Sequence, residues 1–436
     1  MSLSGKHVAI LGAGRSGRAA AALALREGAR VSVWDTAGAA AFSGMPEGVE
    51  IHPEATEEKG RAVVSDLLVV SPGIDTYGSY VAAFSANSGE VIGEVELAAR
   101  YFTGRIIAIT GTNGKTTTTE LVARILAHAG LDGVACGNYG VPFAEVILTA
   151  KPPAVVSLEL SSFQLETIRT LHPVVSIWLN FAPDHMDRYP TVEAYRAAKL
   201  RIFENQMPED TAVVRTGEDL PAISPRIVSF STTEPGTEWF SDGREITFKG
   251  EVVVNLDRDT ALRGLHNAEN TMAAFAACAA LGIPLHVMRE ALHGYAPPPH
   301  RCELIRTLDG VEYLNDSKAT NLHALESALR SQTRPVILIA GGKEKGLDYT
   351  PVLPLLKEKA LAAVTFGQIA RPLADLFSQV VPCQSVVTLA DAVQAARELA
   401  PHGSTILLSP GTSSFDQFTG YEQRGNAFRD LVHQLH

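Results

Sequence analysis

The stretch "ITGTNGKTTTTE" (residues 109–120) decides the fold of the middle of this chain. It begins at the end of an apolar run, "RIIAIT" (105–110), that predicts a buried strand, and its glycines form a turn that ends where a helix is predicted to begin. Backbone N–H groups of such a turn can cradle phosphates, Lys115 can reach the terminal phosphates, and Thr116 can ligate Mg²⁺. The usual phosphate loop has a glycine where this chain has Ile109. A purely structural turn would not require Lys then Thr at the helix start, so we interpret the stretch as a loop for a nucleotide polyphosphate with Mg²⁺, by default ATP.

The residues after this loop alternate between predicted helices and predicted strands. The helices are expected at about 115–129, 191–205 and 266–282, and the strands at 154–160 and 174–180. This alternation is typical of a mostly parallel sheet that is covered by helices on both faces. The strand-rich segment 211–257, with turns at 241–243 and 249–251, predicts an antiparallel flap or subdomain.

A second glycine motif, "GAGRSG" (12–17), lies near the start of the chain. It follows a predicted strand at 7–11 and opens a helix, and Asp35 stands at the end of the next predicted strand, 30–34. The glycines let the backbone approach a pyrophosphate, whose charge is favoured at the N-terminus of a helix. The motif alone is weak, and tight packing of strand against helix is its structural alternative. In this context we interpret it as a site for a dinucleotide or a nucleotide sugar.

A third α/β segment follows the triple proline Pro297-Pro298-Pro299, which predicts a stiff link and a domain boundary. Its strands are expected at 312–316, 335–342, 362–367 and 404–410. Three of them lead into the polar loops "NDSKATN" (315–321), "GGKEKG" (341–346) and "SPGTSSFDQF" (409–418). The loops share the ligand-binding edge of a parallel sheet. Each polar side chain alone is more often solvated than functional, but together they favour a pocket for an acidic small molecule.

The predicted fold class is therefore α/β with three domains. We expect a Rossmann-like nucleotide-sugar domain at 1–93, a P-loop-type ATPase domain with a parallel sheet and a small antiparallel part at 94–298, and a Rossmann-like domain at 299–436.

Composition narrows the classes of function. The 436 residues carry a net charge of -11, so there is no overall basic field to attract nucleic acid. The four cysteines are Cys136, Cys278, Cys302 and Cys383; they form no C-x-x-C pair, which argues against a structural zinc site or a disulfide framework. No apolar run approaches the ~18 residues of a membrane span. We expect a cytoplasmic protein, and a monomer.

Several polar residues near predicted strand ends are candidates for metal or nucleotide binding. Glu159 ends an apolar strand and Asp184-His185 follows the next one, so oxygen and imidazole ligands converge on one sheet edge, although Glu159 alone could equally reach solvent. Asn267 and Asn270 open a helix, where capping competes with adenine contact. Arg301 could clamp phosphates, although a surface ion pair is commoner. Lys199 is on a predicted helix, and the sequence alone gives no reason to place it anywhere but on the surface.

The motifs "GAGRSG", "TGTNGKTTTT", "LELSSFQLE", "APDHMDRY", "NDSKATN" and "SPGTSSFDQFTGYEQRG" run in one order over nearly the whole chain. In this set and order the chain resembles the cytoplasmic muramyl peptide ligases of bacterial cell-wall synthesis. The phosphate loop of that family is T-G-T-N-G-K-T/S, which accounts for Ile109. The resemblance is to the branch that adds D-glutamate to UDP-N-acetylmuramoyl-L-alanine through an acyl phosphate and a tetrahedral intermediate. A sibling ligase with other amino-acid specificity is the alternative.

The resemblance also implies roles for individual residues, with ATP and a pair of Mg²⁺ ions as ligands. Catalytic roles would fall to Lys115, Glu159, His185 and Lys199. The metals would be held by Thr116, Glu159, His185 and by Lys199 if it is carbamylated. ATP would be bound by Gly111, Thr112, Asn113, Gly114, Lys115, Thr116, Thr117, Asn267, Asn270, Arg301 and Asp316. The UDP-sugar would be bound by Gly14, Arg15, Ser16, Asp35, Thr36, Ser71, Pro72, Gly73 and Asn138, with His185 also meeting its muramoyl part. D-glutamate would be bound by Lys318, Thr320, Lys345, Ser414, Phe415 and Tyr421.

Three other classes of protein compete with this interpretation. An NAD-dependent oxidoreductase would use the first glycine motif but leaves the Lys115 loop unexplained. A nucleotide-hydrolysing switch would turn over nucleotide regardless of any amino acid. A ligase of the folate-polyglutamate type shares the ATP domain, yet would not need the motif at 12–17.

Overall fold

The computed structural model describes residues 2–186, 188–260, 262, 264–296 and 299–436. Pro297 and Pro298, where we predicted a stiff link, lie outside these residues. Contacts between residues group the chain into two compact units, Met1–Asn255 with Glu269–His293, and Leu256–Ala268 with Gly294–His436. The first unit holds two sheets and the second holds one.

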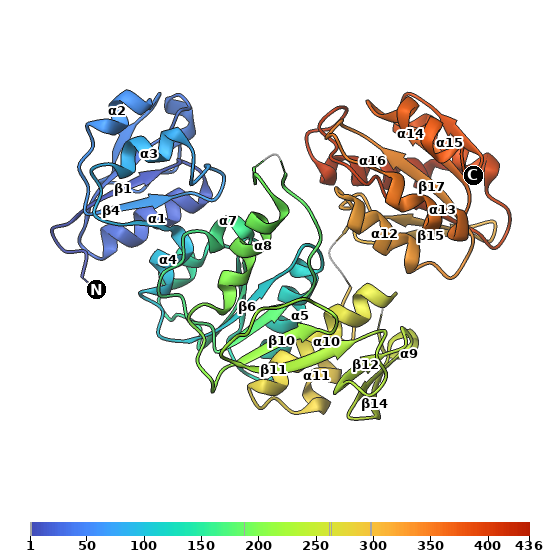
Figure 1. Ribbon diagram of the computed structural model, residues 1–436, viewed down its shortest axis with the longest axis horizontal. Coiled ribbons are helices and arrows are strands. Elements are labelled where there is room, and N and C mark those ends of the chain that lie inside the picture. Colours follow the sequence, from blue (N-terminus) through green and yellow to red (C-terminus); the bar gives the residue numbers. More distant parts are fainter. Residues whose placement is uncertain (1, 187, 261, 263, 297–298) are drawn as a thin grey trace. The chain divides into compact units, whose positions relative to one another are not determined.

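The N-terminal sheet is parallel throughout, in the order β3-β2-β1-β4-β5. Its strands are β1 (His7–Leu11), β2 (Arg30–Trp34), β3 (Glu50–His52), β4 (Leu67–Val70) and β5 (Val91–Gly93). The helices are α1 (Arg15–Arg26), η1 (Ala39–Phe42), α2 (Glu57–Arg61), α3 (Ser79–Ser85) and α4 (Glu94–Ala99). Alternate residues of β1 face opposite layers, because Val8 and Ile10 pack with the alanines of α1 while Ala9 and Leu11 pack with Phe84 of α3. Helices therefore cover both faces (Figure 1).

The central sheet has the order β14-β13-β12-β11-β10-β9-β6-β8-β7. Its strands are β6 (Arg105–Thr110), β7 (Val134–Gly137), β8 (Val155–Glu159), β9 (Val175–Trp178), β10 (Thr211–Arg215), β11 (Arg226–Ser231), β12 (Trp239–Ser241), β13 (Glu245–Phe248) and β14 (Glu251–Asn255). The associated helices are α5 (Lys115–His128), α6 (Phe143–Ile147), α7 (Ser162–Leu165), α8 (Val192–Leu200), η2 (Arg201–Phe203), α10 (Leu265–Ala280) and α11 (Leu285–Leu292). Among the described strands of this sheet, only the pairs β12–β13 and β13–β14 are antiparallel.

The expectation of an antiparallel flap from 211 to 257 is therefore wrong for its first half. Strands β10 and β11 pair in parallel with each other, β10 pairs in parallel with β9, and β11 with β12, so they extend the central sheet. The connections 216–225 and 232–238 return the chain to the same end of the sheet, as parallel pairing requires. The antiparallel part is limited to the hairpins at β12–β14, which contain both predicted turns.

The C-terminal sheet has the order β15-β16-β20-β17-β18-β19. Its strands are β15 (Glu303–Leu308), β16 (Val311–Asn315), β17 (Val336–Gly341), β18 (Ala360–Phe366), β19 (Cys383–Ser385) and β20 (Thr405–Leu408). The second unit also holds α9 (Leu256–Asp259), α12 (Leu322–Arg330), η3 (Thr350–Val352), α13 (Leu353–Lys359), α14 (Ala370–Phe377), α15 (Leu389–Leu399) and α16 (Tyr421–Gln434). β15 and β16 form an antiparallel hairpin that the sequence did not predict, and the other pairs are parallel. The α/β architecture with three sheet domains confirms the predicted fold class.

No helix in the part of the chain that the structure describes is long and apolar enough to cross a membrane.

Candidate active site

The loop between β6 and α5 is shaped by glycines that no other residue could replace without strain. Gly114, at the N-terminus of α5, has a φ of 85°, in the left-handed region. A Cβ there would lie 2.2 Å from Asn270 Oδ1. At Gly111 a Cβ would lie 2.9 Å from the Cβ of Leu179. The backbone of the loop is thus enclosed by β9 and α10, with its amides at the start of a helix, where an anion is favoured.

Two lysine head groups converge on one carbonyl of this loop. Lys115 Nζ donates to Gly111 O and to Thr112 O, each at 2.9 Å, and Lys199 Nζ donates to Gly111 O at 2.9 Å. Lys199 is only 2% exposed, so the expectation of a surface lysine is wrong. Burial holds the pKa of Lys199 well below its usual value, and the charge of Lys115 lowers it further, against the opposite influence of Asp184 and Glu159. An anion at the loop would gain from the Lys115 ammonium.

Asparagine and threonine side chains fix the loop in place. Asn180, which ends the stretch predicted as a strand at 174–180, accepts from Asn113 N at 2.9 Å and donates to Asn113 O at 3.1 Å. Thr112 Oγ1 donates to Ala182 O, and Thr118 Oγ1 donates to Asn270 Oδ1. Asn180 was missed from the sequence. Its position at the end of a strand, beside the loop of a neighbouring strand, was the signal that could have found it.

Glu159 ends β8, whose neighbour in the sheet is β6, the strand that leads into the loop. It is 2% exposed, so it does not reach solvent. Its Oε1 accepts from Asn138 Nδ2 at 2.7 Å, while Oε2 has no hydrogen-bond partner among the described residues. A buried carboxylate oxygen without a partner is costly unless a cation or a donor meets it.

These residues fit Mg²⁺ bound together with phosphate. Within the described ranges, no group of three or more His, Cys, Asp or Glu side chains could hold a metal unaided. Mg²⁺ commonly binds through one or two carboxylates together with substrate phosphates and waters, so Glu159 and the Thr116 hydroxyl suffice as protein ligands. His185, on the loop after β9, is exposed; its ring packs edge-on against Phe163 and Tyr195.

Except for Asn138, which follows β7 of the central sheet and donates to Glu159, the predicted UDP-sugar residues gather at one edge of the N-terminal sheet, because β2, β1 and β4 are parallel neighbours. Gly14, Arg15 and Ser16 lie at the start of α1, Asp35 and Thr36 follow β2, and Ser71, Pro72 and Gly73 follow β4. Asp35 Oδ2 accepts from Ala13 N at 2.7 Å and Oδ1 accepts from Ala37 N at 2.8 Å. A carboxylate therefore already binds an amide of the first glycine turn.

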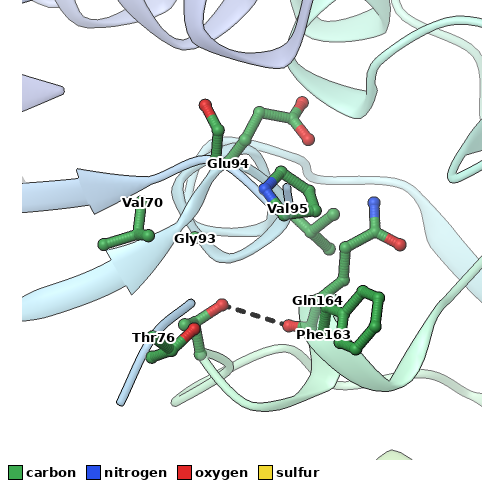
Figure 2. Close-up of a pocket in the computed structure, with 10 residues that line it drawn as sticks. Val70, Thr76, Gly93, Glu94, Val95, Phe163 and Gln164 are labelled. Atoms are coloured by element: carbon green, nitrogen blue, oxygen red, sulfur yellow. Dashed lines mark hydrogen bonds between the residues drawn. The ribbon is translucent and has the colours of Figure 1, made fainter. Parts of the chain in front are cut away.

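A small pocket joins this edge to the central domain. Its lining includes Ser71, Pro72 and Thr76 from the N-terminal domain and Phe163 and Gln164 from α7; Glu94 and Gly93 also contribute (Figure 2). Ser71 Oγ has no partner among the described residues. Arg15, also predicted for the UDP-sugar, instead donates to Gly140 O at 2.8 Å and lies 3.6 Å from Glu145.

In the second unit, the three predicted loops meet at one sheet edge, since β16, β20 and β17 are adjacent and parallel. Asp316 accepts from Ser409 Oγ at 2.9 Å, and burial raises its pKa to about 7. The Lys318 ammonium lies 3.8 Å from the centre of the Tyr421 ring. Ser414 is buried, whereas Lys345 and Phe415 are exposed and Thr320 is partly so. Asn267 and Arg301 belong to this unit as well.

Arg424 was missed as a residue that organises these loops. It lies in the first turns of α16, is fully buried, and donates to Ser317 O at 2.8 Å and to Thr412 O at 3.2 Å. It thereby links the loop of Lys318 to the loop of Ser414. Its signal was the arginine in "TGYEQRG", which the sequence could not distinguish from a solvated helix residue.

Comparison with known proteins agrees with this arrangement. Three family models match in order: a Mur ligase MurD-like N-terminal domain at residues 6–93, a Mur ligase middle domain at 109–278, and a Mur ligase glutamate ligase domain at 300–411. The UDP-N-acetylmuramoylalanine--D-glutamate ligase of Myxococcus xanthus is 39% identical, covering 100% of each chain. The protein of the same name from Pelodictyon phaeoclathratiforme is 37% identical and covers 100% of this chain and 99% of its own.

Solved structures share the fold at low identity. The MurF ligase of Thermotoga maritima in complex with ADP superposes with a TM-score of 0.62 at 15% identity, covering 99% of this chain and 96% of that one. The UDP-N-acetylmuramate-alanine ligase of the same organism gives 0.59 at 18% identity, covering 98% and 99%. With full-length relatives well above 30% identity and all three domain models in order, the chain belongs to the Mur ligase family.

Proposed function

We propose that this protein is an ATP-dependent ligase that joins D-glutamate to UDP-N-acetylmuramoyl-L-alanine, in the synthesis of peptidoglycan precursors. The observation that carries the ATP-dependent chemistry is the glycine loop at the N-terminus of α5, where the Lys115 head group donates to the Gly111 and Thr112 carbonyls. The choice of substrates is supported by the names of relatives that are 37–39% identical over nearly their whole length.

The reaction begins with activation of a poor electrophile. The alanyl carboxylate of the nucleotide sugar attacks the γ-phosphorus of ATP, so that an acyl phosphate forms and ADP leaves. Lys115 neutralises charge on the phosphates as the phosphoryl group moves, and the loop amides at the start of α5 bind the phosphate oxygens. Bound Mg²⁺, held by Thr116 and Glu159 with His185 as a further candidate, would add charge neutralisation at those phosphates.

The second half forms the amide. The amine of D-glutamate attacks the acyl carbon, a tetrahedral intermediate forms, the C–O bond to phosphate breaks, and the amine loses its proton. Lys318, Thr320, Lys345, Ser414, Phe415 and Tyr421 are the proposed D-glutamate residues. The cationic Lys318 and Lys345 suit the carboxylates of the amino acid. Asn267, Arg301 and Asp316 are the proposed contacts to the rest of ATP.

Burial of Lys199 supports the proposal that it carries a carbamate. Its amine is held in a site that disfavours the ammonium form, as the lowered pKa indicates. A neutral amine is the form that reacts with CO₂. Carbamylation would replace a buried amine by an anion beside Lys115, and would give Mg²⁺ another oxygen ligand.

The function is tested by measuring ADP release with Mg²⁺, ATP and UDP-N-acetylmuramoyl-L-alanine. D-glutamate is supplied, omitted, or replaced by L-glutamate, L-lysine or L-alanine. We expect release only with D-glutamate. Release with another amino acid would favour a sibling ligase with other amino-acid specificity. Release that ignores all amino acids would reduce the protein to a nucleotide hydrolase.

A further inference from the structure

Arg188 lies between two loops that the proposed reaction uses. It follows the His185 turn of the central domain, and its side chain is only 13% exposed. Nη2 donates to Ile74 O at 2.9 Å and Nη1 to Pro72 O at 3.4 Å, both in the loop after β4 of the N-terminal domain. One guanidinium thus binds two carbonyls of the loop proposed to hold the UDP end of the nucleotide sugar.

The same side chain is fixed from the central domain. Its guanidinium carbon lies 4.3 Å from the centre of the Phe163 ring, and Nη2 lies 3.3 Å from Glu166 Oε2, whose side chain is 1% exposed. The hydroxyl of Tyr189 donates to the other oxygen of Glu166. A planar guanidinium can stack on a ring and donate in its plane at once, which an ammonium cannot.

The backbone of Arg188 holds the His185 turn. The N–H groups of Arg188 and Tyr189 both donate to His185 O at 3.0 Å. His185 has a φ of 58°, in the left-handed region that non-glycine residues adopt only when the surroundings hold them there. The Phe163 ring that lies under the guanidinium also packs against the His185 ring, with centroids 5.0 Å apart.

We propose that Arg188 is a positioning residue that couples the nucleotide-sugar loop at 71–76 to the turn that carries His185. The coupling rests on the proposed function, since it assumes that UDP binds beside Ser71 and Gly73 and that His185 serves the reaction. Three contacts of Arg188, Pro72, Thr76 and Phe163, line the pocket that joins the two domains. Binding of the nucleotide sugar at that edge would therefore act on the turn that carries His185 through the Arg188 side chain.

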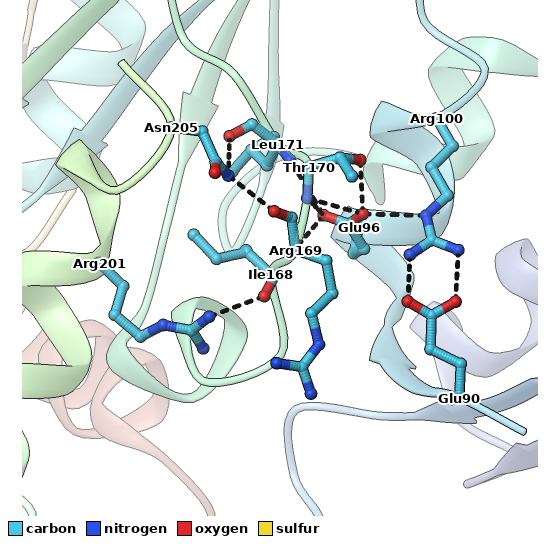
Figure 3. A network of polar contacts seen from close by, with 9 residues as sticks. All are labelled: Glu90, Glu96, Arg100, Ile168, Arg169, Thr170, Leu171, Arg201 and Asn205. Carbon is cyan, nitrogen blue, oxygen red and sulfur yellow. Dashed lines mark hydrogen bonds and ion pairs between the residues drawn. The ribbon is translucent and has the colours of Figure 1, made fainter. Parts of the chain in front are cut away.

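A second buried contact, between the helix that follows the N-terminal domain and the turn 169–171 of the central domain, supplies a matched control. Glu96 of α4 is fully buried and accepts from Arg169 N at 2.9 Å and from Thr170 N and Leu171 N at 3.0 Å, while Arg100 pairs with it at 2.9 Å (Figure 3). Its partners belong to α4 and to the turn 169–171. Loss of its charge would loosen the domain junction without touching the Arg188 contacts.

The experiment compares Arg188→Gln, Arg188→Lys and Glu96→Gln with the unaltered protein. Calorimetry measures the binding of UDP, UDP-N-acetylmuramoyl-L-alanine and ADP, and turnover gives kcat at saturating nucleotide sugar. We expect Arg188→Gln to weaken both uridine ligands by ~10-fold or more, to lower kcat as well, and to leave ADP binding within about 2-fold. Arg188→Lys should lie between, and Glu96→Gln should leave the affinities near those of the unaltered protein.

Equal losses in Arg188→Gln and Glu96→Gln would overturn the inference, because they would reflect only a looser junction. So would weaker uridine binding at an unchanged kcat, because Arg188 would then serve one loop alone. If Arg188→Gln does not fold, Arg188→Lys decides, and uridine affinities equal to those of the unaltered protein would overturn the inference. If the unaltered protein binds ADP but neither uridine ligand, the proposed function itself fails, and this inference fails with it.

Discussion

The two glycine loops of this chain occupy the same place in their domains, yet different side chains bind their backbones. Each follows the first strand of its sheet and opens a helix. In the loop at 12–17, an amide of the turn already donates to the Asp35 carboxylate. In the loop at 110–116, Lys115 and Lys199 both donate to the Gly111 carbonyl. Similar backbone turns thus become different sites, because a carboxylate binds an amide of one and lysine head groups bind a carbonyl of the other.

This difference suggests what each loop can bind. A carboxylate at the turn repels phosphate oxygens but accepts from hydroxyl and N–H donors, as the ribose and base of a nucleotide offer. Lysines at the turn favour the terminal phosphates of a triphosphate. The loops should therefore respond to separate ligands and to separate substitutions.

The largest effect is expected from Lys115→Ala. Removal of this ammonium should lower the rate of ADP release by at least ~10³-fold, because charge on the transferring phosphoryl group loses its nearest protein cation. Calorimetric binding of UDP should stay within about 2-fold. Lys151→Ala, at a lysine that is 87% exposed, is the control and should change neither. A parallel loss of UDP binding in Lys115→Ala would contradict the independence of the two loops.

The next effect is on stability, and it distinguishes the glycines of the two loops from ordinary turn glycines. In Gly17→Ala the new Cβ would lie 1.9 Å from Gly12 O, and in Gly114→Ala 2.2 Å from Asn270 Oδ1. Each change should lower the free energy of unfolding by about 3 kcal/mol in urea denaturation. Gly250 shares the φ of 85° with Gly114 but has open space around it, so Gly250→Ala should cost only about 1 kcal/mol. If Gly114→Ala and Gly250→Ala lower the free energy of unfolding by similar amounts, the loop must move to relieve the close contact with Asn270.

Strand positions and loop locations could be predicted from the sequence because they depend on local patterns. Apolar runs of strand length, most of them ending at a Gly or Asn, located β1, β6, β8, β9 and β17 to within a few residues. The direction of β10 and β11 could not be predicted from the sequence, because a run of apolar residues does not indicate which neighbouring strand it pairs with. The strand β15 was missed altogether, because its sequence, ELIRTL, is no continuous apolar run.

The parts of the site that the sequence missed depend on convergence in space. Lys199 reads as an ordinary helix lysine, and only the approach of α8 to the phosphate loop buries it. Asn180 and Arg424 act by bonding to backbone groups far away in sequence, whose positions exist only in the folded chain. The glycine loops were identifiable because their function is encoded in consecutive residues.

The third prediction is that the free energy of unfolding depends on pH through the ionisation of Glu94. Glu94, in the pocket with Ser71 and Pro72, is fully buried, and burial raises its pKa to about 7 from 4.5. Since its pKa in the folded state lies above that of the unfolded chain, Glu94 costs nothing below about pH 4.5 and destabilises increasingly as pH rises toward 7. Glu94→Gln should therefore raise the free energy of unfolding by about 2 to 3 kcal/mol at about pH 8 and leave it unchanged near pH 4.5. An offset that is constant across this range would show that packing, not ionisation, is responsible.

Asp35→Asn tests the anion at the first loop with a smaller effect. The amide keeps one acceptor for Ala13 N but removes the charge, so hydrogen bonds to a bound nucleoside weaken. We expect UDP affinity to fall by ~10-fold and ADP affinity to stay the same, as measured by calorimetry. Tighter UDP binding in the variant would mean that the carboxylate mainly repels the diphosphate, and that the uridine lies elsewhere.

The smallest effect on stability is expected from Gly14→Ala. This variant also tests most directly whether the first glycine motif binds a ligand or only packs α1 on β1. This glycine has an ordinary φ of -69°, and a methyl group at its Cα would meet nothing within 4 Å. The free energy of unfolding should therefore change by less than about 0.5 kcal/mol, in contrast to Gly17→Ala in the same motif. If Gly14 is kept free of a side chain so that a diphosphate can approach the start of α1, UDP affinity should still fall by several-fold, roughly 5. Unchanged UDP affinity would assign the whole motif to the packing of α1 on β1, and would leave Asp35 and the loop after β4 as the nucleotide contacts of this domain.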